Sequence, residues 1–143
     1  MLLSDQSERL PALEAAVIGR PQPEPDLVAV QRALQDTWVV GIDPDRTVRA
    51  IHAIGSSRLL LGRSHEVGYT WQIMLSQALA QRRGLDEPDQ RCWIAATIAL
   101  STFGEAVTGW VRDGCPGTAD AVDTTFATLH QVCRNTVSRR SSR

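Results

Sequence analysis

The chain has 143 residues, a length typical of one domain with its own hydrophobic core. Hydrophobic residues make up 43% of it and charged residues 22%, which is the balance of an ordinary globular protein. No uninterrupted apolar run reaches the roughly eighteen residues of a membrane span. The first residues include Asp5 and Glu8 and lack the basic-then-apolar order of a secretory signal. The composition therefore predicts a globular domain without a membrane segment.

The formal charge of −1 hides an uneven distribution of basic residues. All 15 are arginine, and four of them lie in the Ser/Arg-rich end, residues 134–143, which contains no acid. Without this end, 11 basic residues (15 − 4) face 16 acidic ones, so the rest of the chain carries −5. A chain segment with this net negative charge is poorly suited to bind the phosphate backbone of a nucleic acid. We expect residues 134–143 to be a disordered tail, with contact to nucleic acid as the alternative.

Three cysteines, Cys92, Cys115 and Cys133, are odd in number, far apart and without CxxC spacing. A disulfide framework or a zinc site would need paired or closely spaced cysteines. Reduced thiols in a cytoplasmic protein fit this pattern better.

Apolar residues recur at helical spacing through the chain, and almost no strand pattern is present. A first helix covers residues 3–17, where Pro11 either kinks it or restarts it. Residues 19–25 contain three prolines and one glycine and must form a connection. A second helix runs from about Asp26 to Gly41.

Clear boundary signals mark the next two helices. The third helix begins with Asp43 as its N-cap and Pro44 as its first residue. Residues 56–57, both serine, either continue this helix or break it. A long fourth helix follows and ends at Arg82 and Arg83, which complement its dipole before a left-handed cap at Gly84.

A fifth helix starts at Asp86 or Glu87 with Pro88, and a sixth is capped by Thr118 after a turn over residues 113–117. Each carries a stripe of large apolar residues and a stripe of small ones, which lets another backbone approach closely. The small stripes are Ala95, Ala99, Thr102, Ala106 and Gly109 on the fifth helix, and Ala121, Thr125, Thr128 and Val132 on the sixth. A small domain has limited means to cover both helices, so we expect these stripes to form a dimer interface.

Candidate catalytic residues are few. His65 and Glu66 begin a pattern like the zinc-protease motif HExxH, but Tyr69 stands where the second zinc-binding histidine is needed. His130 and Cys133 lie one helical turn apart without a third group to orient them, so we expect Cys133 in the core and His130 at a surface or interface. No phosphate-binding loop or carboxylate cluster is present. The sequence therefore predicts no catalysis, no metal and no cofactor.

A small-molecule site is favoured by large or adaptable side chains on successive helices, beside a few polar groups. The candidate ligand-binding residues are Trp38, His52, Tyr69, Trp71, Met74, Trp93, Thr97 and Phe103. For Trp38, Trp71 and Phe103, the alternative is a place in the ordinary core. Arg58, near a helix start, either meets an anionic ligand head or is simply exposed.

This helix series resembles the C-terminal half of transcriptional regulators of the TetR (tetracycline-repressor-like) family. The resemblance covers roughly residues 1–133 and is carried by the segments LPALEAAVIGRP, SSRLLLGRSHEVGYTWQIMLSQALAQRRGLDEPD and IAATIALSTFGEAVTGWVRDG. The last segment ends in a W-x-x-x-G signature, Trp110 to Gly114. The resemblance implies an all-α domain of about six helices, whose last two form a four-helix bundle with a second copy. It also implies a cavity for a small hydrophobic or acyl-type effector.

One feature of that family has no counterpart in this chain. Its regulators begin with a helix-turn-helix head of about fifty residues that inserts a helix into the DNA major groove. We therefore expect an effector-sensing and dimerisation domain that reaches DNA only through a head missing from this chain. The alternative is a headless interaction module that forms mixed dimers with a full-length regulator and sequesters it.

Overall fold

The computed structural model describes residues 6–141, and the side chains of residues 8–136. Within this range it is all-α, as the sequence predicts, with six α-helices, one short π-helix and no strand. The elements are α1 (Gln6–Ile18), α2 (Asp26–Leu34), the π-helix η1 (Gln35–Val39), α3 (Pro44–Ser56), α4 (Arg58–Arg82), α5 (Gln90–Arg112) and α6 (Thr118–Ser141). Pro11 lies inside α1, and Leu3 falls outside the described residues.

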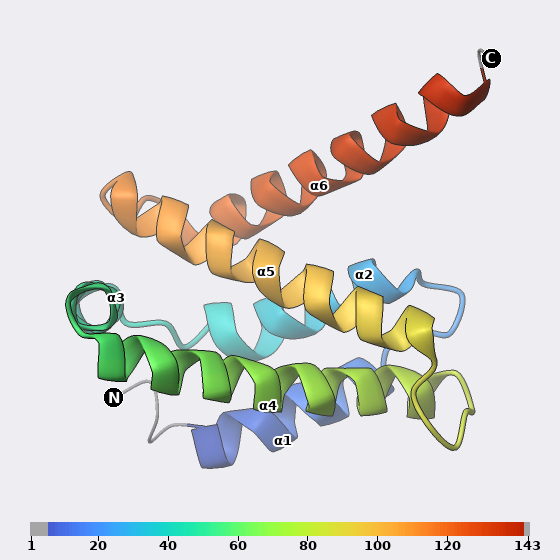
Figure 1. Ribbon diagram of the computed structural model, residues 1–143, viewed down its shortest axis with the longest axis horizontal. Helices are drawn as coiled ribbons and strands as arrows, with labels where there is room; N and C mark the ends of the chain where they lie inside the picture. Colours follow the sequence, from blue (N-terminus) through green and yellow to red (C-terminus); the bar gives the residue numbers. More distant parts are fainter. Residues whose placement is uncertain (1–5, 142–143) are drawn as a thin grey trace.

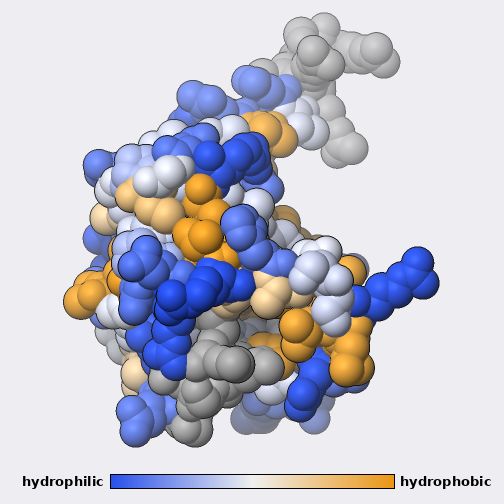
Figure 2. All heavy atoms as spheres, turned by 90° about the vertical axis from the view of Figure 1, so that its left-hand side faces the viewer, coloured by the Kyte–Doolittle hydropathy of each residue, from blue (hydrophilic) through white to orange (hydrophobic). Residues whose placement is uncertain are grey.

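The long helix α4 is the centre of the arrangement. α1 packs along one side of α4 and α5 along the other, while α6 packs on α5 (Figure 1). α3 crosses the N-terminal end of α4, and the second half of α6 extends beyond the other helices (Figure 1). Figure 2 views the molecule from the α3 end, where exposed hydrophobic side chains lie among hydrophilic ones. α2 packs on α5 and continues directly into η1.

The core is built from the apolar faces of five helices. Its fully buried large side chains are Leu13, Val17, Val30, Leu34, Leu75, Leu79, Val122 and Phe126. They come from α1, α2, the C-terminal half of α4, and α6, and they pack with small residues of α5. Burial of these faces, and not helix propensity alone, holds short helices such as the nine-residue α2 together.

Several helix boundaries lie where the sequence predicts them. The Asp43 carboxylate accepts the Arg46 backbone N–H at 3.2 Å, so Asp43 is the N-cap of α3 and Pro44 its first residue. Ser57 adopts an extended conformation and caps α4, so the serine pair breaks the helix. Gly84 has φ +74°, and the Leu85 N–H donates to the Ala80 carbonyl at 2.8 Å, which is the expected left-handed cap.

The W-x-x-x-G segment closes α5 in the same way. Gly114 has φ +85°, and the N–H of Cys115 donates to the carbonyl of Trp110 at 2.9 Å. The Trp110 indole N–H also donates to the carbonyl of Pro116, so this buried side chain fixes the turn between α5 and α6.

Two boundaries differ from the prediction. α5 begins after Asp89, not at Asp86 or Glu87, because the Asp89 carboxylate accepts the Cys92 backbone N–H at 2.9 Å. This bond from Cys92, more than the nearby Arg83, lowers the pKa of Asp89. The second difference is α2, which ends at Leu34 and passes into η1, so that Trp38 sits on a wider helical turn.

α6 continues past the predicted domain boundary at residue 133 to Ser141. Residues 134–141 are therefore helical in the structure, while residues 142–143 lie outside the described part of the chain. The local reason is that no glycine or proline occurs after Gly117, so nothing in the sequence interrupts the helical hydrogen bonds.

Arg82, in the last turn of α4 as the sequence predicts, is a buried cation. Its guanidinium donates to the Asp26 carboxylate at 2.9 Å and to the carbonyls of Pro21 and Glu24, each at 2.5 Å. Its side chain is 2% exposed. In turn, the Gln22 side-chain amide donates to the Arg82 carbonyl at 3.1 Å. This single side chain thus holds the proline-rich connection against α4.

Replacing Arg82 by methionine is expected to lower the free energy of unfolding by about 3–5 kcal/mol, because the buried Asp26 carboxylate would lose its main partner. The matched control is Arg83→Met, which removes a partly exposed ion pair with Asp89 and is expected to cost less than about 1 kcal/mol. Urea denaturation measures both. Equal losses in the two variants would contradict the structural role of Arg82.

Candidate ligand cavity

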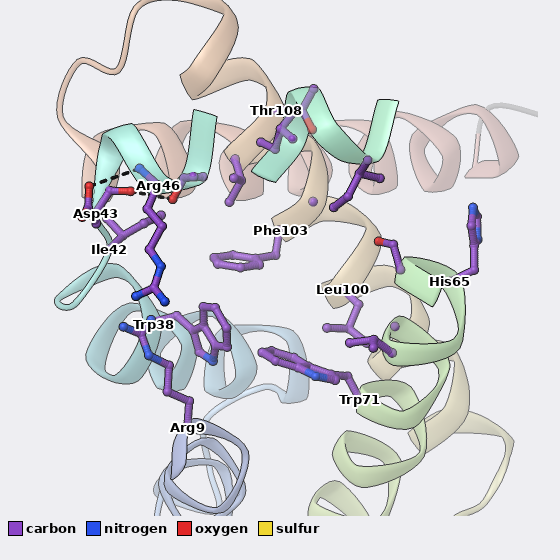
Figure 3. A pocket seen from close by; sticks show the side chains of 18 of the residues that line it. Arg9, Trp38, Ile42, Asp43, Arg46, His65, Trp71, Leu100, Phe103 and Thr108 are labelled. Carbon is purple, nitrogen blue, oxygen red and sulfur yellow. Dashed lines mark hydrogen bonds between the residues drawn. The ribbon is translucent and has the colours of Figure 1, made fainter. Parts of the chain in front are cut away.

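A cavity of about 600 Å³ lies where η1, α3, α4 and α5 meet. This volume is in the usual range of small-molecule sites. Its wall is mainly apolar, formed by Trp38, Ile42, Ile51, Ile54, Leu60, Val67, Trp71, Leu100, Phe103 and Val107. Polar side chains lie near its edges: Arg9, Asp43, Arg46, Thr47, Ser64, His65 and Thr108. Figure 3 shows the aromatic and aliphatic side chains converging on the cavity from different elements.

α3 covers one side of the cavity and is only loosely joined to the core. Ile51 and Ile54 line the cavity, but Thr47 is the only buried side chain that α3 contributes. The Thr47 hydroxyl donates to the Asp43 carbonyl at 2.8 Å within the same helix. α3 therefore gains little apolar burial from the protein, and its apolar face is available to a bound molecule.

Two tryptophans form the floor of the cavity. The rings of Trp38 and Trp71 lie 4.6 Å apart at 60°, and the residues are only 6% and 7% exposed. Neither buried indole N–H has a hydrogen-bond acceptor among the described residues. An unsatisfied buried donor costs about 1–3 kcal/mol, so each of these indole groups lowers the stability of the domain.

Arg9 connects α1 to this end of the cavity. Its guanidinium lies 4.9 Å from the centre of a Trp38 ring and donates to the Gly41 carbonyl at 3.0 Å. A methyl group added at Gly41 would come within 3.1 Å of the guanidinium, so glycine allows this close approach. The Asp43 carboxylate nearby is bonded to the first turn of α3.

A second, more polar groove of about 410 Å³ adjoins the cavity between α4 and α5. The two share Ser64, His65, Gly68 and Leu100. Within the groove, the Gln72 amide donates to the Thr97 hydroxyl at 2.5 Å. The groove therefore adds hydroxyl, amide and imidazole groups beside the apolar cavity.

The eight predicted ligand-binding residues divide into three groups. Trp38, Trp71 and Phe103 line the cavity. Tyr69 and Thr97 line the adjoining groove. The other three line neither: Met74 packs against the core, Trp93 is partly buried, and His52 is exposed on α3.

Sequence reasoning missed the charged end of the cavity. Arg9 and Arg46 line it, whereas Arg58, the arginine considered for an anionic ligand, is exposed and does not. The contact between Arg9 and Gly41 joins positions far apart in the chain, so no local pattern marks it. The sequence around Asp43 did predict this residue as the N-cap of α3, and the start of α3 determines the position of Arg46 on the helix.

The stripe of small residues on α5, predicted to face a second copy, packs largely against other helices of the same chain. Ala95, Ala99 and Ala106 are buried in the core, so their side chains already pack against this chain's own helices. Thr102, Gly109, Ala121 and Thr125 are partly buried, and Thr128 and Val132 are exposed. Close helix packing inside the domain therefore accounts for the buried alanines, and a surface for a second copy must use the exposed positions.

The other residues considered for chemistry lie on two different helices, α4 and α6. Cys133 is exposed, so its predicted place in the core is wrong, because the second half of α6 extends away from the other helices (Figure 1). His130 is partly buried. His65 and Glu66 are both exposed on α4. Among the described side chains, no three histidine, cysteine, aspartate or glutamate residues come together as metal ligands would.

No family model matches the chain, and no curated protein matches it. The TetR-like resemblance therefore stays a prediction. Among the described helices, α5 is long and apolar enough to span a membrane by length and composition alone. In the structure, α5 packs between α4 and α6, as the core helix of a globular domain does.

Gly104 provides a direct test of the cavity, since a Cβ at this lining position meets nothing within 4 Å. Gly104→Leu is expected to raise the free energy of unfolding by about 0.5–1 kcal/mol, the gain from removing a glycine inside a helix. Gly62→Leu on α4, which is equally open but outside the cavity, is the matched control. Urea denaturation that shows Gly104→Leu to be destabilising while Gly62→Leu is not would contradict an open cavity.

Proposed function

We propose that this chain is the effector-sensing and dimerisation domain of a transcriptional regulator of the TetR type, active in the cytoplasm and without catalysis. The observation that carries the proposal is the cavity, an apolar chamber of about 600 Å³ with few polar groups at its edges. Such a chamber favours a small hydrophobic effector over a nucleic acid or a peptide. DNA binding by such a regulator would come from a separate helix-turn-helix head.

The position of the cavity suits a sensor. Its wall combines residues from α1, η1, α3, α4 and α5, so one ligand would contact five elements at once. A ligand changes a conformational equilibrium only if it contacts one arrangement better than another. The loosely anchored α3 is the element whose position such a ligand would stabilise most, because Ile51 and Ile54 would gain a partner.

α6 supports the dimerisation part of the proposal. Residues 131–136 are all exposed, and this half of the helix extends away from the domain (Figure 1). An isolated helical segment this short is only marginally stable in water. Packing against a second copy, in a bundle formed by α5 and α6 of each copy, would cover exposed apolar residues such as Val132 and Ile94. The same surface would serve the alternative function, a mixed dimer with a full-length regulator.

The effector proposal predicts binding of a medium-length amphiphile such as decanol. Titration is expected to change the fluorescence of wild type, and most of this change should disappear in Trp38→Phe and Trp71→Phe, which alter the cavity floor. Each additional methylene of a longer alcohol should tighten binding about fourfold, since burying one contributes about 0.8 kcal/mol.

Gly104→Leu should weaken this binding by placing a side chain in the cavity, whereas Gly62→Leu should bind like wild type. Equal binding by both glycine variants would place the ligand elsewhere. If wild type binds none of the alcohols, the proposed effector function is wrong.

The dimerisation proposal predicts that Val132→Arg yields a monomer by light scattering, because Val132 is 59% exposed and a charge there would be buried between copies. Its helicity and unfolding free energy should stay close to those of Gln77→Arg, a control at an exposed site on α4. Ala99→Arg is unsuitable, since that side chain is buried within one copy and its replacement would disrupt the domain itself. A Val132→Arg protein that remains dimeric would exclude this half of α6 as the interface.

A further inference from the structure

We infer that the effector is an anionic amphiphile, with an apolar body in the cavity and one carboxylate bound to Arg9 beside Trp38. This inference rests on the proposed function and names the chemical class of the ligand. Its starting point is the unequal distribution of charge around the cavity, where one end carries Arg9 and most of the wall is apolar (Figure 3).

Arg9 is placed to bind a ligand and not only to stabilise the fold. Its interactions among the described residues are one hydrogen bond to the Gly41 carbonyl and the contact with Trp38. No carboxylate pairs with it within that part of the chain. A partly buried guanidinium beside an apolar chamber gains most from an anion that uses its remaining N–H donors.

The guanidinium is also held in a fixed direction. Gly41 accepts from Nη2 at 3.0 Å, and the Trp38 ring lies against the guanidinium carbon at 4.9 Å. Such restraint reduces the conformational entropy lost when a ligand binds. Arginine presents its N–H groups as a planar fork that matches the two oxygens of a carboxylate.

The two indole N–H groups and the Asp43 carboxylate at this end are already engaged or shielded. The indole N–H groups of Trp38 and Trp71 are buried away from solvent, so they do not offer a donor to the cavity as it stands. The Asp43 carboxylate accepts the backbone N–H of Arg46 at 3.2 Å, which commits it to the start of α3. Arg46 brings a second guanidinium to this end, so both cations favour an anionic ligand end, and Arg9 is the one whose direction is fixed by Gly41 and Trp38.

The other end of the cavity differs in character. His65 lies there, on the opposite side of the view in Figure 3 from Arg9, and it also lines the polar groove. The apolar side chains of Leu100 and Phe103 lie between these ends (Figure 3). This order of groups fits a ligand with a charged end at Arg9 and an apolar chain that runs toward the α4–α5 groove.

The test compares three ligands with the same apolar body: decanoate, decanol and decyltrimethylammonium. Each is titrated into wild type, Arg9→Gln, Arg9→Lys and Arg49→Gln, with isothermal calorimetry as the readout. Arg49 is the matched control, an exposed arginine on α3 that does not line the cavity.

Wild type should bind decanoate more tightly than decyltrimethylammonium. Arg9→Gln should weaken decanoate binding by about tenfold or more, the effect of losing a charge-assisted hydrogen bond, and leave decanol binding unchanged. Arg9→Lys should retain part of the preference for decanoate, because it keeps the charge but not the fork. Arg49→Gln should match wild type with all three ligands.

Each contrary outcome has a distinct meaning. Unchanged decanoate binding in Arg9→Gln, or tighter binding of the ammonium compound, overturns the carboxylate inference and leaves the proposed effector cavity standing if decanol binds. Loss of decanol together with decanoate in Arg9→Gln also overturns it, because Arg9 would then shape the cavity and not select the charge. If wild type binds none of the three, the proposed function itself fails.

Discussion

The buried ion pair between Arg82 and Asp26 is the constraint on which the rest of the domain depends. It fixes the C-terminal end of α4 to the start of α2 and to the carbonyls of the proline-rich connection. α1, which carries Arg9, leads into this connection, and η1, which carries Trp38, follows α2, so the pair anchors the segment that joins them. Leaving either charge unpaired in the interior would cost far more than a surface ion pair contributes.

The two ends of the domain differ in how deeply their side chains are buried. The C-terminal half of α4 is buried, with Leu75 and Leu79 fully enclosed, whereas the first half of α4 and all of α3 are largely exposed or partly buried. Segments with few buried apolar contacts open at the lowest cost in free energy. The cavity lies at the less buried end, where a small ligand adds enough apolar contact to change which arrangement is favoured.

The features that the sequence could predict are those that depend on interactions between residues close together in the chain. Asp43 and Gly84 act on backbone groups within one turn, and the structure confirms their predicted roles. The sequence left open whether the serine pair at residues 56–57 continues or breaks the helix, and the structure shows Ser57 as the N-cap of α4. Arg9 and Arg82 meet partners that are distant in sequence, so their roles depend on the completed fold. The start of α5 was missed for a local reason, since three acidic residues near Pro88 compete as caps and only Asp89 has the right spacing to the Cys92 N–H.

The stripe of small residues on α5 shows a second reason why the sequence could not predict the whole structure. Close packing needs small side chains whether the neighbouring helix belongs to the same chain or to another, so Ala99 and Ala106 could not distinguish the two cases. In the structure these alanines face the chain's own core, while α5 also contributes Leu100 and Phe103 to the cavity and packs on α6. The helix that borders the ligand is thus the one that supports the proposed dimer surface. If an effector shifts α5, dimer affinity must change with it, and by the same coupling free energy dimerisation must change the affinity for the effector.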